Sequence, residues 1–242
     1  MKKQIIFLLV LFFTSCSTND INISSSTISS FTSTSSELVT SISSNENTSS
    51  KQSENTSIKS ENSSQSTSIT KPKLRIYLNP SVQTKNMYTG HNLSEADTMN
   101  IVAKKAYNLL QKDNRFIVYI NDSLKPLKES VNEINSLNID YHLALHSNAG
   151  GGSGSEVYYY ENTSSYLAKH ALNSFNKYHT FPTRGIKKNN TYYELKNSKA
   201  KNKALIEFLF HDKINEANFI VSNYDLLATS VYETFVNIIN EQ

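Results

Sequence analysis

A long apolar segment followed by a glycine-rich loop constrains this chain most strongly. Residues 139–148 read IDYHLALHSN, the glycines of 150–154 come next, and a second extended segment follows at 156–160. A short apolar run bounded by turn residues is typical of a buried strand. Ligands collect where the strands of an open α/β sheet end. The sequence therefore predicts a site at the end of this strand, with His146 in it.

Apolar strands alternate with amphipathic helices through the C-terminal part of the chain. We expect strands at 74–78, 116–120, 139–146, 156–160, 192–195 and 204–210, and helices after Ser94 and at 126–137, 165–178, 214–222 and 224–239. Ser94, with Asp97 three residues later, is typical of a helix N-terminus. This alternation predicts an α/β fold, a single domain whose mostly parallel central sheet has helices on both faces.

The first 70 residues do not follow this alternation. Residues 1–16 carry two lysines and then an apolar run too short to span a bilayer, which is typical of a secretory signal. The signal ends at Cys16 and resembles a bacterial lipoprotein signal, in which this cysteine is lipidated; an ordinary signal peptide with an incidental cysteine is the alternative. Residues 17–70 hold 30 Ser or Thr among 54 residues, which predicts a disordered tether.

These features predict where the domain at 71–242 works and what it does not bind. It is expected outside the cytoplasm, attached to the membrane only through the lipid anchor. The net charge of +3 is too small to indicate a nucleic acid partner. A solute-binding lipoprotein would fit the signal and the tether, but the domain is too small for two lobes.

Two carboxylates stand out as candidates for chemistry. Glu207 interrupts the apolar segment 204–210, where a charge is costly unless it is paired, coordinated or exposed at a strand end. Glu95 follows Ser94 in the first turn of a helix, where a carboxylate is often only a partner of the helix dipole. Glu207 is therefore the stronger candidate on these grounds.

Taken in order, these segments resemble the zinc-dependent N-acetylmuramoyl-L-alanine amidases, which cleave the amide between the lactyl group of N-acetylmuramic acid and L-alanine in peptidoglycan. The matching segments are LSEADTMN at 93–100, ALHSNAG at 144–150, GSEVYYY at 154–160, RGIK at 184–187 and LIEFLF at 205–210. The resemblance implies peptidoglycan as the partner and a Zn²⁺ cofactor held by Glu95 and His146. It also implies that Glu207 is the catalytic general base.

Two further residues are expected to contact the substrate. Arg184, in the Arg-Gly pair, is placed to hold a substrate carboxylate, and a charged turn residue on the surface is the alternative. Asn148 is placed to hydrogen-bond the glycan or to support the glycine-rich loop. The glycines give an open rim that a polymer could approach.

One motif of the family is missing. Where its members carry Asp-Pro-Gly-His, which supplies the first zinc histidine, this chain reads LNPSVQ at 78–83, so that Val82 replaces the histidine and Gln83 follows. A glutamine oxygen is a weaker zinc ligand than imidazole. Three explanations stay open: Gln83 replaces the histidine, His91 or His211 reaches the site, or the domain is a non-catalytic peptidoglycan-binding lipoprotein on the same fold.

Two arguments narrow these explanations. His142 lies four residues before His146 on the same strand face, about 13 Å away at 3.3 Å per residue, so both cannot bind one zinc ion. Glu207 destabilises an apolar strand, so its presence favours the enzyme over the binding protein.

Overall fold

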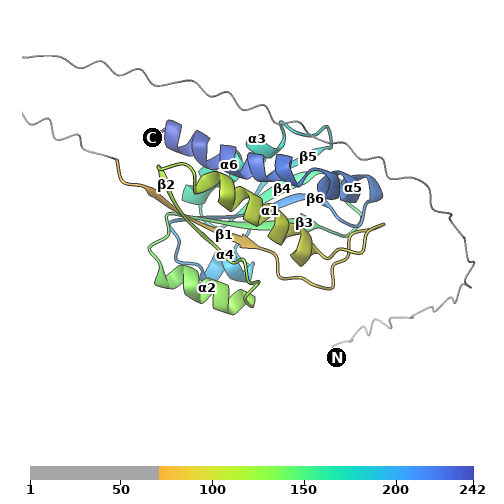
Figure 1. The fold of residues 1–242 in the computed structure, drawn as a ribbon, viewed down its shortest axis with the longest axis horizontal. Coiled ribbons are helices and arrows are strands. Elements are labelled where there is room, and N and C mark those ends of the chain that lie inside the picture. The colour runs from red at the N-terminus through yellow and green to blue at the C-terminus, as the bar shows by residue number, and fades with distance from the viewer. Residues whose placement is uncertain (1–70) are drawn as a thin grey trace, which may run out of the picture. The chain divides into compact units, whose positions relative to one another are not determined.

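In a computed structural model of the chain, residues 71–242 are described and form an α/β domain (Figure 1). Cys16, the predicted signal at 1–16 and the predicted tether at 17–70 lie outside the described residues. The strands are β1 (Leu74–Pro80), β2 (Phe116–Ile120), β3 (Tyr141–Asn148), β4 (Ser155–Tyr159), β5 (Thr183–Lys188) and β6 (Asn202–Phe210). The helices are α1 (Glu95–Leu110), α2 (Leu127–Ser136), α3 (Ser165–Phe175), α4 (Tyr193–Asn197), α5 (Ile214–Ser222) and α6 (Tyr224–Asn240), with a short 3₁₀ turn at Asn162–Ser164. Within 71–242, every helix is too short or too polar to cross a membrane.

The six strands form one sheet in the order β2-β1-β3-β6-β4-β5. The first four strands in this order are parallel, β4 is antiparallel to β6, and β5 is parallel to β4. The mostly parallel sheet is therefore confirmed. Its consequence for function is that β1, β3 and β6, which lie side by side at the centre, all end at the same edge.

Helices cover both faces of the sheet, as predicted (Figure 1). Helices α1, α3 and α6 pack on one face over the main core, to which Leu143, Leu145 and Phe208 contribute. Helices α2 and α4 lie on the other face, where Ala144 and Leu205 of the sheet pack against Leu195 of α4. Successive side chains of a strand point to opposite faces. The face under α4 therefore receives His142, Ala144 and His146.

The N-terminus of α1 is fixed by its cap. The side chain of Ser94 accepts a hydrogen bond from the Asp97 backbone, and the Asp97 carboxylate accepts one from the Ser94 backbone. This is the reciprocal capping box that the sequence predicts. It fixes the first helical residue, Glu95, at the carboxyl end of β1 and β3.

Two elements differ from the sequence prediction. Residues 192–195 were expected to form a strand but lie at the start of α4, where the Lys196 and Ser198 amides donate to the carbonyls of Tyr192 and Glu194. The aromatic pair in YYEL favours a strand locally. The helix instead lets the adjacent Glu194 and Leu195 both point inward and leaves Tyr193 exposed.

The sequence does not predict strand β5 and indicates a turn at the Arg-Gly pair of residues 184–185. The strand is at the edge of the sheet, and most of its side chains are exposed. Its sequence, TRGIKK, therefore carries little of the apolar signal by which a strand is recognised. Gly185 has φ of +81°, a value that favours glycine.

Candidate active site

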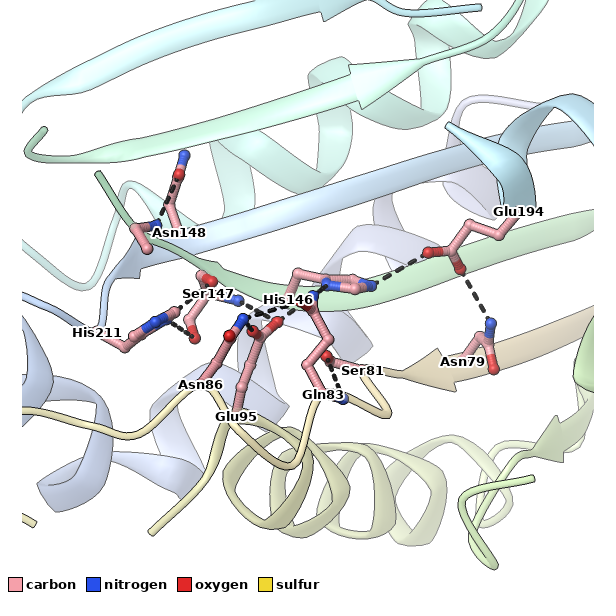
Figure 2. A network of polar contacts seen from close by, with 11 residues as sticks. Asn79, Ser81, Gln83, Asn86, Glu95, His146, Ser147, Asn148, Glu194 and His211 are labelled. Atoms are coloured by element: carbon pink, nitrogen blue, oxygen red, sulfur yellow. Dashed lines mark hydrogen bonds and ion pairs between the residues drawn. The ribbon is translucent and has the colours of Figure 1, made fainter. Parts of the chain in front are cut away.

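The candidate site lies where β1, β3 and β6 end, and His146 is at its centre (Figure 2). Oε1 of Glu95, at the start of α1, lies 2.9 Å from Nδ1 of His146 near the end of β3. The other oxygen of Glu95 accepts a hydrogen bond of 2.8 Å from the Asn86 side chain. Glu95 is fully buried and is therefore part of this cluster rather than only a partner of the helix dipole.

A second carboxylate holds the opposite side of the imidazole. Oε1 of Glu194 lies 3.1 Å from Nε2 of His146. The sequence analysis missed Glu194 because it placed this segment on a strand. Glu194 lies in the polar segment NNTYYELKN and interrupts no apolar run of the kind that marked Glu207, so no local signal identifies it.

The two carboxylates determine the charge state of the metal-free cluster. Burial alone would lower the pKa of His146, but the hydrogen bonds to Glu194 and Glu95 outweigh burial and hold this pKa well above its ordinary value. Burial likewise opposes ionisation of Glu95 and Glu194, yet their bonds to His146 lower the pKa of both. Without a metal ion, an imidazolium is thus held between two carboxylates.

Glu207 lies next to this cluster and forms no ion pair within residues 71–242. It is the register partner of His146 on β3 and of Glu156 on β4, so the three side chains share one face of the sheet. Its Oε2 is buried and has no hydrogen-bond partner within 71–242. Burial raises the pKa of Glu207 to about 8; the charge of His146 partly opposes this shift, and the neighbouring carboxylates add to it. Perturbed carboxylates of this kind concentrate at functional sites.

Glu156 gathers the predicted substrate-binding residues. Its buried carboxylate accepts hydrogen bonds from Arg184 Nε at 2.9 Å, from Asn148 Nδ2 at 2.6 Å and from the Tyr158 hydroxyl, and it pairs with Lys187. Burial opposes its ionisation, but these donors outweigh burial and lower the pKa of Glu156. The sequence analysis gave Glu156 no role, although it lies in the GSEVYYY segment.

The glycine-rich loop is tied to the end of β6. The Asp212 carboxylate accepts hydrogen bonds of 2.8 Å from the backbone amides of Gly150 and Gly151. Gly154 has φ of +94°, and a Cβ atom there would lie 2.0 Å from the Pro182 carbonyl oxygen. Only glycine fits this position. The loop is thereby fixed beside Asn148 and the Glu156 cluster.

The three candidates for the missing ligand lie in different places. Nε2 of Gln83 is 3.5 Å from Nδ1 of His146, and its Oε1 accepts from Asn86. His91 instead bonds to Asn218 of α5 at 2.7 Å. His211 is buried, with Nδ1 3.1 Å from both the hydroxyl and the carbonyl oxygen of Ser147. Of the three, only Gln83 has a polar contact with His146.

His142 is buried on the sheet face that α4 covers. Its nitrogens have no hydrogen-bond partner within 71–242, and Nε2 lies 3.7 Å from Oε2 of Glu194. Burial lowers the pKa of His142 to about 4, so it is neutral.

The donor set can be compared with what zinc requires. Zinc binds imidazole nitrogen and carboxylate oxygen at about 2.0 Å, so two tetrahedral ligands lie roughly 3.3 Å apart. Glu95 Oε1 and His146 Nδ1 are 2.9 Å apart, and the Gln83 amide is near the same nitrogen. Glu194 cannot join them because it faces the other ring nitrogen. Within 71–242, no three His, Cys, Asp or Glu side chains converge to hold an ion. The residues fit zinc only if Gln83 is the third ligand.

A pocket of about 240 Å³ opens on this cluster. It is lined by Gln83, Leu127, His146, Tyr192, Tyr193, Glu194, Leu205 and Glu207. A larger hollow of about 720 Å³ lies near Lys71 and Arg115 but contains no carboxylate or imidazole among its lining residues. Of these two pockets, the smaller one therefore makes the imidazole and the carboxylates of the candidate site accessible to a ligand.

Comparisons with known proteins bear on the family and on the fold. Residues 76–237 match the family model described as N-acetylmuramoyl-L-alanine amidase. A comparison with curated protein sequences returned no match. Among solved structures, an N-acetylmuramoyl-L-alanine amidase from Clostridium difficile 630 is similar, with a TM-score of 0.64 and 22% identity over 71% of this chain and 100% of that one. Amidase AmiC2 of Nostoc punctiforme has a TM-score of 0.62 and 18% sequence identity, over 69% of this chain and 97% of that one. The catalytic domain of CwlV from Bacillus (Paenibacillus) polymyxa has a TM-score of 0.61 and 14% sequence identity, over 70% of this chain and 99% of that one.

The raised pKa of Glu207 predicts how the stability of the metal-free protein depends on pH. The folded-state pKa of about 8 lies above the ordinary value of 4.5, so the folded state binds more protons than the unfolded state between these values. The contribution of Glu207 to the free energy of unfolding is therefore lost as the pH rises from about 5 to about 8. Because glutamine does not titrate, the free energy of unfolding of Glu207→Gln should increasingly exceed that of the natural chain over this range.

Denaturant unfolding between about pH 5 and about pH 9 measures this difference. Glu129→Gln, at an exposed position of α2, is the matched control and should show no such trend. If the Glu207→Gln difference does not change with pH, Glu207 is ionised in the folded state and our electrostatic account of it is wrong.

Proposed function

Because this chain belongs to the N-acetylmuramoyl-L-alanine amidase family, we propose that it hydrolyses the amide between the lactyl group of N-acetylmuramic acid and L-alanine of the peptidoglycan stem. The observation that carries the proposal is Glu207, whose buried Oε2 has no hydrogen-bond partner in the described part of the chain and which lies beside the Glu95–His146 pair. A carboxylate in this position is suited to proton transfer during hydrolysis. The pocket beside it is open to a substrate chain.

Glu95, His146 and Gln83 are the residues that would hold a zinc ion in this proposal. Gln83 would bind through Oε1, which in the structure accepts a hydrogen bond from Asn86. When bound, zinc supplies a Lewis acid that lowers the pKa of a ligated water and polarises the amide carbonyl. The imidazolium proton on Nδ1 must leave before His146 can ligate, so binding releases a proton.

Glu207 moves the protons of the reaction. As a carboxylate it accepts the proton of the attacking water, and it then donates this proton to the amine nitrogen of the departing L-alanine. The pKa of about 8 means that the metal-free site favours the protonated form at neutral pH, and a positive charge nearby would favour the carboxylate that the first step requires. Its unpartnered Oε2 is free to contact the water.

Arg184 and Lys187 are proposed to hold a carboxylate of the stem peptide. Both pair with Glu156, which leaves this cluster with a net positive charge. The Arg184 guanidinium lies over the Phe210 ring, 5.2 Å from its centroid, and its side chain is 37% exposed. Since Nε is used by Glu156, the terminal nitrogens can form the paired bonds that a carboxylate accepts. Asn148, which bonds to Glu156, is proposed to hydrogen-bond the glycan or to support the glycine-rich loop.

We also propose that the domain acts outside the cytoplasm on the cell wall, with Cys16 lipidated and residues 17–70 acting as a tether. The support for this is the signal-like sequence before Cys16 and the substrate of the family. Peptidoglycan is then the partner, and membrane attachment is through the lipid alone.

Zinc content tests the proposed ligand set. The full-length chain, dialysed against metal-free buffer, should retain about one zinc ion per molecule. Gln83→Ala should weaken zinc binding about tenfold to a hundredfold, since a contact to a charged group is worth about 1.5–3 kcal/mol. His91→Ala is the matched control and should leave binding unchanged because His91 bonds to Asn218. The reverse result would assign the ligand to His91. A chain that takes up no zinc would support the non-catalytic binding lipoprotein.

Glu207→Gln tests the general base. We expect hydrolysis to fall about 10²–10⁴-fold, while zinc content and the folded structure are retained. Release of L-alanine amino groups from purified peptidoglycan measures the rate, and zinc titration measures the metal. Glu129→Gln should behave like the natural chain. Hydrolysis at the natural rate by Glu207→Gln would exclude the general-base role.

Arg184→Gln tests the proposed carboxylate contact. The KM for stem-peptide substrates should rise about tenfold or more, because a charge-assisted hydrogen bond is lost. The effect should be much smaller for substrates whose stem carboxylates are amidated. Lys196→Gln, at an exposed position of α4, is the control. An equal effect of Arg184→Gln on both substrates would mean that Arg184 supports the fold and does not select the substrate.

A further inference from the structure

A continuous series of buried hydrogen bonds ends on His146. Glu194 accepts from His146 through Oε1 and from the Asn79 side-chain amide, at 2.9 Å, through Oε2. The carbonyl oxygen of Asn79 in turn accepts from Nδ2 of Asn121 at 3.3 Å. Figure 2 shows Glu194 between His146 and Asn79, with its two oxygens directed at different partners. Glu194 is 4% exposed and therefore has little contact with water.

The far end of this series is fixed to the backbone. Oδ1 of Asn121 accepts from the Lys125 amide at 2.8 Å, and Nδ2 also donates to the Lys125 carbonyl at 3.1 Å. The orientation of the Asn121 amide is thereby set, and Asn121 then sets that of Asn79. Asn79 must present its NH₂ group to Glu194, because its oxygen is used by Asn121. The series connects the end of β2, the end of β1, α4 and β3.

The two nitrogens of His146 consequently have different surroundings. Nε2 faces Glu194. When ionised, this carboxylate accepts hydrogen bonds and cannot donate one. Nδ1 faces Glu95 and the amide of Gln83. In a neutral imidazole only one nitrogen carries the proton. A carboxylate on one nitrogen of a metal-ligating histidine sets the tautomer and orients the ring.

We propose that Glu194 is a positioning residue that keeps the His146 proton on Nε2 and so reserves Nδ1 for a metal ion. The inference rests on the proposed zinc site and adds a residue that neither the family match nor the sequence motifs assign. Asn79 and Asn121 act through Glu194 by fixing which partner each of its oxygens meets.

Glu194→Gln tests this proposal because the Asn79 NH₂ group dictates how the new amide is placed. Its oxygen must face Asn79, so its NH₂ group faces Nε2 of His146 and donates to it. The ring proton then moves to Nδ1, the nitrogen reserved for the metal. We expect the zinc affinity of the full-length chain to fall about tenfold to a hundredfold.

The double variant Asn79→Asp with Glu194→Gln should restore most of this affinity. The carboxylate at position 79 accepts from the new amide, so the amide oxygen can turn to His146 and accept from Nε2 again. Glu216→Gln is the matched control, a buried carboxylate that bonds to Ser153, Gly154 and Phe210 and has no contact with His146. Its zinc affinity should equal that of the natural chain.

Nitrogen NMR of the His146 ring provides a readout that a purely structural role would not change. The natural zinc-loaded chain should show a protonated Nε2 and a ligated Nδ1, and metal-free Glu194→Gln should show the proton on Nδ1 at neutral pH. Unchanged zinc affinity of Glu194→Gln, or ligation through Nε2, would overturn the proposal. If Glu194→Gln does not fold, the spectrum of the natural chain decides. A natural chain without zinc affinity would instead contradict the proposed metal site itself.

Discussion

The site depends on how buried carboxylates are compensated at the edge where three central strands end. Burying a charge is costly, and removing the partner of a buried charge is costlier still. His146 is the partner of both Glu95 and Glu194, which come from α1 and α4 on opposite faces of the sheet. The imidazole therefore links the two helical layers through the end of β3, and the position of each carboxylate depends on the other two groups.

The same principle distinguishes Glu156 from Glu207, since the two differ in how their buried charge is compensated. Glu156 is compensated by two cations, a tyrosine hydroxyl and Asn148, and its pKa is lowered. Glu207, which pairs with it directly across β4 and β6, has no such donors, and its pKa is raised. The pKa values of two carboxylates at neighbouring positions on one sheet face are thus shifted in opposite directions. Under the proposed function, this difference lets one sheet face carry both a substrate-binding cluster and a proton-transfer group.

Most of the fold and the centre of the site could be predicted from the sequence, and the failures have physical causes. The apolar strands and the Ser94 cap are local signals. They predict Glu95 at a helix start, His146 at a strand end and Glu207 within another strand, and the structure brings the three together. β5 was missed because an exposed edge strand lacks apolar alternation, and α4 was taken for a strand because five residues are too few to show a helical period. Glu194 was lost with α4, since its role depends on packing between distant segments.

The substituted histidine motif does not by itself indicate a decayed site. In a domain that had lost its chemistry, Gln83 would need no connection to the ion-pair cluster, yet its amide lies next to His146 and is tied to Glu95 through Asn86. Glu207 carries the stronger argument. Because burial raises the pKa of Glu207 from 4.5 to about 8, the free energy of unfolding falls as the pH rises between these two values. A domain that only bound peptidoglycan would gain stability from an uncharged residue there, so this cost supports the proposed role of Glu207 in proton transfer.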